Sequence, residues 1–153
     1  MNFDSLTSNS SLGGAMGGQH RYPSNCGMGL TIRYVSSSTG YLSCNTGDGT
    51  NRTFNTYYGK TLLQADTWYH VCMTYDGQTI RLYVNGTLDN RDGANYTYTA
   101  QKNIEDYIFI GAWSSGDSSG NRTLHGNYKL NGCINDFRAY NHCLSPREVK
   151  LLA

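Results

Sequence analysis

The sequence has little charge and no long apolar segment. Charged residues are 15% of its 153 residues, the formal net charge is +1, and no run of lysine or arginine occurs. We therefore expect no nucleic-acid partner and no membrane partner, since both need concentrated positive charge or a long apolar span. The polar, glycine-rich residues 1–20 show no signal peptide.

Common metal and catalytic motifs are also missing. The cysteines are odd in number and lack C-x-x-C spacing, which argues against a disulfide framework and a zinc site. They are Cys26, Cys44, Cys72, Cys133 and Cys143. We expect them to be free, with Cys72 and Cys133 as small buried apolar residues. No G-x-S-x-G or H-x-x-x-H pattern occurs, and His70 is interpreted as a packed or surface residue rather than a base.

What the chain does contain is typical of a turn-rich β protein: 18 glycines but only 2 prolines. The clearest pattern is a hairpin, in which two β-prone segments flank the turn dipeptide Asp76-Gly77. The two segments cover residues 68–75 and 79–84. Alternation in the second predicts a buried face with Ile80, Leu82 and Val84 and a wet face with Arg81 and Tyr83.

Further strands are predicted on both sides of this hairpin. They cover residues 29–35, 41–45, 52–58, 96–99, 106–112 and 130–140, with 1–6 as a candidate edge strand. Residues 5–18, 88–95 and 113–127 are predicted loops, and Gly59-Lys60 is expected to end the strand before it. Ser145, Pro146 and Glu148 predict a short helix with a capping box. Together these elements predict an all-β jelly-roll sandwich of two antiparallel sheets with one short C-terminal helix.

Two motifs resemble a known family. The runs WYHV, TYDG and LYVNG follow one another within residues 68–86, and GCINDFRAYNHCL covers residues 132–144. They resemble the laminin-G-like domains of the concanavalin A-like lectin/glucanase superfamily. The resemblance implies a single jelly-roll domain over residues 1–153. Residues 1–27 are weakly patterned, so the domain either lacks N-terminal strands or completes a sheet edge with another chain or segment.

The acidic residues do not match the glucanases of that superfamily. Cleavage by a retaining mechanism needs two acids that alternate onto one strand face. The adjacent Glu105 and Asp106 point to opposite faces of a strand, and Asp89 and Asp92 fall in a predicted loop. We therefore expect no enzyme activity, and Asp136 and Arg138 are interpreted as a structural pair on the last strand.

Aromatic residues are the main functional lead, with 13 tyrosines and 2 tryptophans. Aromatic faces stack on sugar rings, and polar side chains bond sugar hydroxyls. Because loops carry binding more often than strands do, the candidates lie near strand ends and in loops. The predicted ligand-binding residues are Tyr57, Tyr58, Tyr96, Tyr98, Trp113 and Asn121. Laminin-G-like domains sometimes hold calcium at a loop rim, and Asp48 and Asp117 are the acids best placed for this ion.

Two functions follow from these features. The first is a non-catalytic recognition module that binds carbohydrate or a cell-surface polymer. The alternative is a structural, assembly or receptor-binding domain of a bacteriophage virion, in its tail, fibre or capsid decoration. The expected partner is a glycan or surface polymer in the first case, and other virion proteins or a second copy in the alternative. The expected location is the virion or the extracellular surface of a cell.

Overall fold

Antiparallel strands dominate the computed structural model, which describes residues 1–6, 13–15, 26–48, 54–93, 95–97, 110–111, 114–116, 122–124 and 129–153. One larger sheet has the order β2–β3–β4–β5, and the other has the order β6–β7–β8 with β9 also paired to β7. The first sheet contains β2 (Gly13–Ala15), β3 (Cys26–Ser36), β4 (Thr39–Asp48) and β5 (Phe54–Gln64). The second contains β6 (Val71–Tyr75), β7 (Thr79–Val84), β8 (Thr87–Leu88) and β9 (Tyr96–Thr97).

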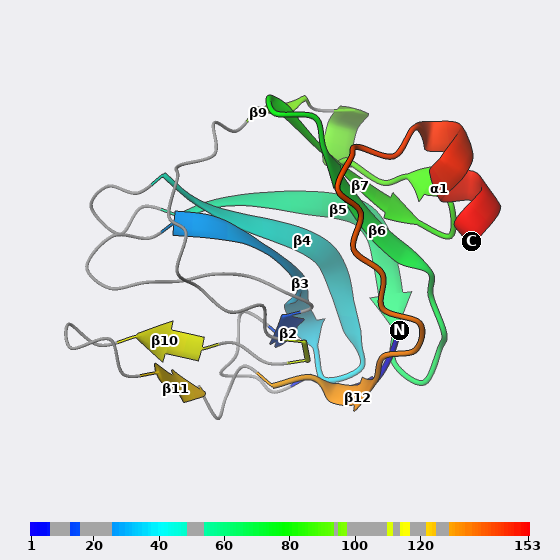
Figure 1. The fold of residues 1–153 in the computed structure, drawn as a ribbon. Helices are drawn as coiled ribbons and strands as arrows, with labels where there is room; N and C mark the ends of the chain where they lie inside the picture. Colours follow the sequence, from blue (N-terminus) through cyan, green and yellow to red (C-terminus); the bar gives the residue numbers. More distant parts are fainter. Residues whose placement is uncertain are drawn as a thin grey trace.

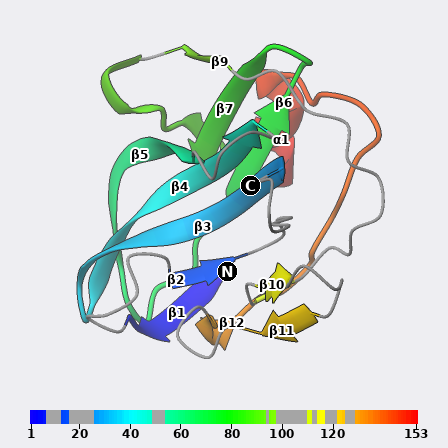
Figure 2. The same ribbon diagram turned by 90° about the vertical axis from the view of Figure 1, so that its left-hand side faces the viewer.

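The two larger sheets enclose the main apolar core. Figure 1 shows β6 and β7 crossing the curved β3–β4–β5 layer, and Figure 2 shows the two layers from a second direction. The core side chains come from both layers and from the start of the chain. They include Phe3, Ile32, Leu42, Leu63, Ile80 and Leu82, each exposed by 1% or less. The predicted antiparallel sandwich with one short C-terminal helix is confirmed.

The hairpin of β6 and β7 matches the prediction, with one difference on its outer face. Ile80, Leu82 and Val84 are buried in the core, as expected. Tyr83 was predicted on the wet face but is only 1% exposed, because it packs against Leu144 and Val149. Val149 belongs to α1 (Pro146–Leu152), so the C-terminal helix covers this side of β7.

The helix begins as the sequence predicts. The Ser145 side chain accepts a hydrogen bond from the Glu148 backbone N–H, and the Glu148 carboxylate accepts one from the Ser145 backbone N–H at 2.8 Å. This capping box satisfies amide groups that the first helical turn leaves without partners. The capping box directs Val149 onto Tyr83 and fixes where the helix starts.

Smaller sheets close the ends of the sandwich. The predicted edge strand at the start of the chain is β1 (Asn2–Ser5), which pairs with β12 (Asn131–Cys133). Gly13–Ala15 and the paired strands β10 (Ser114–Gly116) and β11 (Arg122–Leu124) fall in segments predicted as loops, so the loop prediction was wrong for these residues. Most of the strand predicted over residues 106–112 lies outside the described residues.

The last predicted strand, residues 130–140, is regular only at β12. Asp136 has a φ of 56°, in the left-handed region, which breaks the alternation of an extended strand. The rest of this segment was therefore wrongly predicted as strand. It continues without regular structure along β6 to the helix, which opens a groove rather than completing a sheet.

β5 continues through Gly59-Lys60, where the sequence predicted a break. Opposite this point the register with β4 shifts between Tyr41 and Ser43, the mark of a bulge. The buried carboxylate of Asp89 holds the bulge, because its Oδ1 accepts hydrogen bonds from the backbone N–H and the hydroxyl of Thr61. Lys60 N–H also donates to the Asp89 carbonyl at 2.8 Å.

Asn90 completes the connection between the larger sheets. Its backbone forms an isolated bridge with Gly59 of β5. Its side-chain carbonyl accepts a hydrogen bond from Leu82 N–H at 2.8 Å, and its amide donates to the Ile80 carbonyl at 3.2 Å. Ile80 is the last β7 residue that pairs with β9, and Leu82 comes just before the stretch that pairs with β8. Asp89 and Asn90 are 1% and 4% exposed, although the sequence predicted a loop here.

The cysteines whose side chains the structure describes are free, as expected. Cys44 is fully buried and Cys72 is half-buried, whereas Cys133 and Cys143 are exposed. The expectation of a buried Cys133 was therefore wrong. Burial raises the pKa of the Cys44 thiol to about 12, so this thiol is protonated near neutral pH and acts as a small apolar group.

Gly59→Ala is expected to lower the free energy of unfolding by about 1–3 kcal/mol. A Cβ at this position would overlap with Oδ2 of Asp89 and lie 3.1 Å from the Leu42 carbonyl oxygen. Urea denaturation of the single variants and of the double variant with Asp89→Ala measures the coupling. An equal cost of Gly59→Ala in both backgrounds would show that Asp89 is not the obstacle.

Candidate binding groove on the β6 edge

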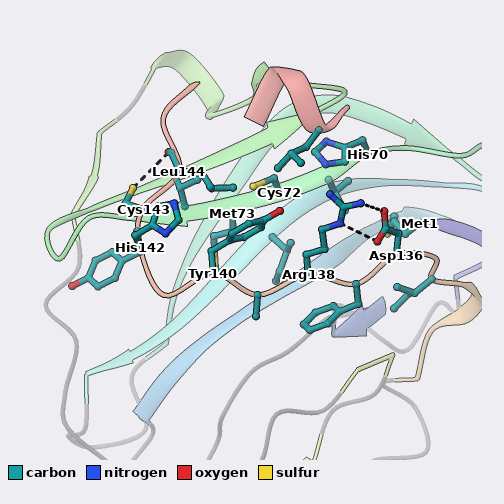
Figure 3. Close-up of a pocket in the computed structure, with 18 of the residues that line it drawn as sticks. Met1, His70, Cys72, Met73, Asp136, Arg138, Tyr140, His142, Cys143 and Leu144 are labelled. Atoms are coloured by element: carbon teal, nitrogen blue, oxygen red, sulfur yellow. Dashed lines mark hydrogen bonds and ion pairs between the residues drawn. The ribbon is translucent and has the colours of Figure 1, made fainter. Parts of the chain in front are cut away.

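A groove of about 780 Å³ runs between β6 and residues 134–144. Its volume lies in the range of ligand pockets, roughly 300–1,000 Å³. In the described residues β6 pairs with β7 alone, so its other edge faces this groove. Figure 3 shows Asp136 and Arg138 near Met1 and His70 at one end, and Tyr140 and His142 toward the other.

An ion pair forms the polar rim at the first end. The Arg138 guanidinium donates hydrogen bonds from Nε at 2.9 Å and from one terminal nitrogen at 2.6 Å to the two carboxylate oxygens of Asp136. This pair holds the pKa of Asp136 below its ordinary value. The predicted pairing is present, but the left-handed backbone of Asp136 produces it rather than a strand face. Both side chains are at least half exposed, so their remaining hydrogen-bonding positions face solvent.

His70 adds a neutral ring to the same end. Its backbone is fixed on both sides by Asn85: His70 N–H donates to the Asn85 side chain at 2.9 Å, and Asn85 N–H donates to the His70 carbonyl at 2.8 Å. Burial lowers the pKa of His70, and the positive charge of Arg138 acts in the same direction. Nδ1 of the ring is buried and has no hydrogen-bond partner in the part of the chain that the structure describes. His70 is thus a packed residue, as interpreted from sequence, that also lines the groove.

Aromatic side chains also line the groove. Phe137 and Tyr140 are 44% and 43% exposed, which leaves their faces open to a ligand. The Tyr140 and His142 rings meet edge to face, with centroids 5.9 Å apart. Cys72 also lines the groove and is half-buried, and burial raises the pKa of its thiol to about 11. The thiol is therefore protonated near neutral pH and is a poor nucleophile.

The carboxylates that line the groove are ionised near neutral pH. Glycoside cleavage needs an acid that remains protonated near neutral pH. Asp76 and Asp136 are the carboxylates among the described residues that line the groove. The pKa of Asp76 is lowered to about 2 by its hydrogen bonds with Arg81 and with backbone N–H groups, and that of Asp136 is also lowered. Both carboxylates accept hydrogen bonds and neither is suited to donate a proton.

Comparison with known proteins identifies the family. A laminin G-type family model, described as the concanavalin A-like lectin/glucanases superfamily, matches residues 2–150. The chain belongs to this superfamily. A solved structure of an S-layer domain-containing protein (residues 221–444) from Clostridium thermocellum ATCC 27405 is similar at 23% sequence identity and a TM-score of 0.45. The match covers 99% of this chain and 63% of that chain, which is less than two thirds of its length.

A search of curated proteins found no match to the chain. Laminin G-like domains are generally binding modules, although the superfamily also includes glucanases. Among the described residues no helix has the length and apolar character that crossing a membrane requires.

Three of the tyrosines that were predicted to bind a ligand, Tyr57, Tyr58 and Tyr96, lie close together where β5 meets β9. The rings of Tyr57 and Tyr96 stack with centroids 4.7 Å apart. The Tyr96 hydroxyl donates to the Tyr58 carbonyl at 2.6 Å, and the Tyr57 hydroxyl donates to the Thr97 carbonyl at 2.7 Å. Tyr57 and Tyr96 thus connect β5 to β9, whereas the ring of Tyr58 contacts arginines.

The other predicted site residues lie elsewhere. Tyr98, Trp113, Asn121 and Asp117 are outside the described residues, and Asp48 ends β4 with a side chain that is not described. Calcium at Asp48 and Asp117 stays a prediction. Within the described residues, no group of three or more His, Cys, Asp or Glu side chains is arranged to hold a metal ion.

The groove itself was not predicted from sequence. Residues 132–144 were recognised as a family motif, but residues 130–140 were assigned to a strand. The groove exists because Asp136 adopts a left-handed conformation, and no local pattern marks this residue, since aspartate tolerates that region without requiring it. The one available signal was the Asp136–Arg138 pair.

The imidazole of His70 is expected to titrate below the ordinary histidine pKa of about 6.5, because burial disfavours its protonated form. The unfolded chain then binds this proton at higher pH than the folded chain. His70 therefore contributes stability above the unfolded-state pKa, and this contribution decreases as pH falls through that value.

NMR titration of the ring protons measures the His70 pKa directly. His70→Gln is expected to weaken the loss of stability between about pH 7 and pH 5. A His70 that titrates at or above the ordinary value would contradict the effect of burial.

Proposed function

We propose that this domain is a non-catalytic recognition module that binds carbohydrate or a cell-surface polymer in the β6 groove. The observation that supports it is the combination, in one groove, of exposed aromatic rings with the ionised Asp136–Arg138 pair. Sugars present alternating apolar faces and hydroxyl edges, and this groove offers a complement to each.

The arrangement suggests how a sugar chain would lie. A pyranose ring stacks on Tyr140 or Phe137, and its hydroxyls donate to the Asp136 carboxylate or accept from free N–H groups of Arg138. Hydroxyl groups that replace water at such positions add selectivity, because charge-assisted hydrogen bonds are stronger than neutral ones.

Two further observations support binding rather than cleavage. Neither groove carboxylate has the raised pKa of a general acid, and the Cys72 thiol is protonated near neutral pH. Membership of a superfamily of lectin-like domains supports a role in adhesion at a cell surface. In this proposal residues 1–153 act as one module.

A second candidate is assembly, either with another copy or with other proteins of a surface layer or virion. It is favoured by the outer edge of β6, which pairs with no strand among the described residues, and by exposed apolar residues near it, above all Trp68, which is 54% exposed. An unpaired edge can recruit a strand from another chain. Light scattering that shows a stable multimer, together with no sugar binding, would favour assembly.

An array of neutral and acidic oligosaccharides first identifies a sugar that the domain binds. Tyr140→Ala and Asp136→Asn are each expected to weaken its binding by roughly five- to tenfold. Calorimetric titration of the purified domain measures the change. Leu151→Ala is the matched control, because it removes a 78% exposed apolar side chain from α1, outside the groove. Binding that survives both groove variants would show that the sugar binds elsewhere.

A further inference from the structure

A second cluster of aromatic and charged side chains lies on the other face of the β3–β4–β5 layer. Ile32 and Leu42 face the core, so Arg33 and Tyr41, one position along each strand, face away from it. Arg33 and Tyr41 are also direct partners across β3 and β4. Tyr58 pairs with Ser43 on the neighbouring strand, two residues from Tyr41, and therefore shares the same face.

Two guanidinium groups, from different elements, lie near these rings. Arg91, in the short 3-10 helix η1 (Arg91–Gly93), places Cζ 4.6 Å from the Tyr41 ring centroid and 5.2 Å from that of Tyr58. Arg33, from β3, places Cζ 6.0 Å from the Tyr58 centroid. Cation–π attraction holds a guanidinium over a ring and leaves its N–H edge available to a ligand.

The backbone fixes Arg91 in this position. Arg91 N–H donates to the Tyr96 hydroxyl at 3.0 Å, and the same hydroxyl donates to the Tyr58 carbonyl. The preceding residues, Asp89 and Asn90, are buried and tied to both sheets. The cluster is therefore organised before any ligand arrives, which lowers the entropy cost of binding.

The positive charge of this cluster is not neutralised within the described residues. Arg81 and Arg138 each form an ion pair with an aspartate, whereas Arg33 and Arg91 pair with no carboxylate that the structure describes. The side chain of Asp89, two residues before Arg91, is turned toward Gly59 and Thr61 instead, and the side chain of the adjacent Asp92 is not described. Two like charges that share one ring favour an anion between or beside them.

We propose that Arg33, Arg91, Tyr41 and Tyr58 form a second binding site, separate from the β6 groove, for an oxyanion carried by a polysaccharide. The anion is a carboxylate, as in a uronic acid, or a sulfate ester, since a guanidinium binds both through paired N–H groups. All four side chains are partly exposed, so a substituent on a polymer chain reaches them. A net charge of only +1 disfavours nucleic acid as the partner.

The test is calorimetric titration of the whole domain with three probes: oligogalacturonate, low-molecular-weight dextran sulfate and neutral dextran. We expect binding of at least one acidic probe and none of neutral dextran, and the first two probes separate carboxylate from sulfate recognition. Arg33→Gln and Arg91→Gln are expected to weaken acidic-probe binding tenfold or more. Equal binding of neutral dextran that Arg33→Gln and Arg91→Gln also weaken, or no binding of either acidic probe, would overturn the proposal.

Three controls separate a built site from general charge attraction. Arg147→Gln removes the same charge from an exposed position on α1 and is expected to change binding less than twofold. Arg91→Lys keeps the charge but loses the planar fork, so its binding should fall as in Arg91→Gln. An equal loss in Arg147→Gln, or full binding by Arg91→Lys, would reject the site.

Two more measurements complete the design. A single-stranded oligonucleotide that binds as tightly as the acidic sugar would overturn the assignment to polysaccharide. Tyr140→Ala, in the groove, is expected to leave acidic-probe binding unchanged, so failure of this site and failure of the groove proposal are distinguishable. Matched thermal unfolding curves show that each variant is folded.

Discussion

The buried dipeptide Asp89–Asn90 is the contact on which the two-layer arrangement depends. The Asp89 carboxylate accepts a hydrogen bond from the Thr61 backbone N–H at the bulge of β5. The Asn90 side-chain amide forms hydrogen bonds with backbone groups of β7. Each of these groups would otherwise be buried without a partner, at a cost of about 1–3 kcal/mol per group. The apolar core brings the sheets together, and these hydrogen bonds fix their mutual register because their geometry is specific.

Features that rest on periodicity could be predicted from the sequence. The alternation of Ile80, Leu82 and Val84 identified the buried face of β7, and the Ser145 and Glu148 spacing identified the start of the helix. Both patterns are local, so the residues themselves carry the information. The motifs around the hairpin and in the closing segment were sufficient to identify the superfamily, and the family match confirms it.

Features that rest on long-range burial could not be predicted. Asp89 and Asn90 were predicted as part of a polar loop, because only the folded chain shows that β5 and β7 enclose them. Tyr83 was predicted to face solvent, because its place in the alternation of β7 does not show that the C-terminal helix covers it. Tyr58 was chosen for its position before a glycine, whereas Arg33 and Arg91, which lie against its ring, come from segments 25 and 33 residues away in sequence. The left-handed Asp136, which opens the groove, is similarly a consequence of tertiary packing.

The amide of Asn90 has a consequence for solubility. β8 and β9 each pair with only part of β7, and the side chain of Asn90 occupies the interval between them by bonding Ile80 and Leu82 as a strand would. This interval therefore offers no free donor or acceptor at these two residues to template edge-to-edge aggregation. Among the described strands, the edges of β6, β8 and β9 then remain open to strand addition, so a glycan held along β6 would cover one of them.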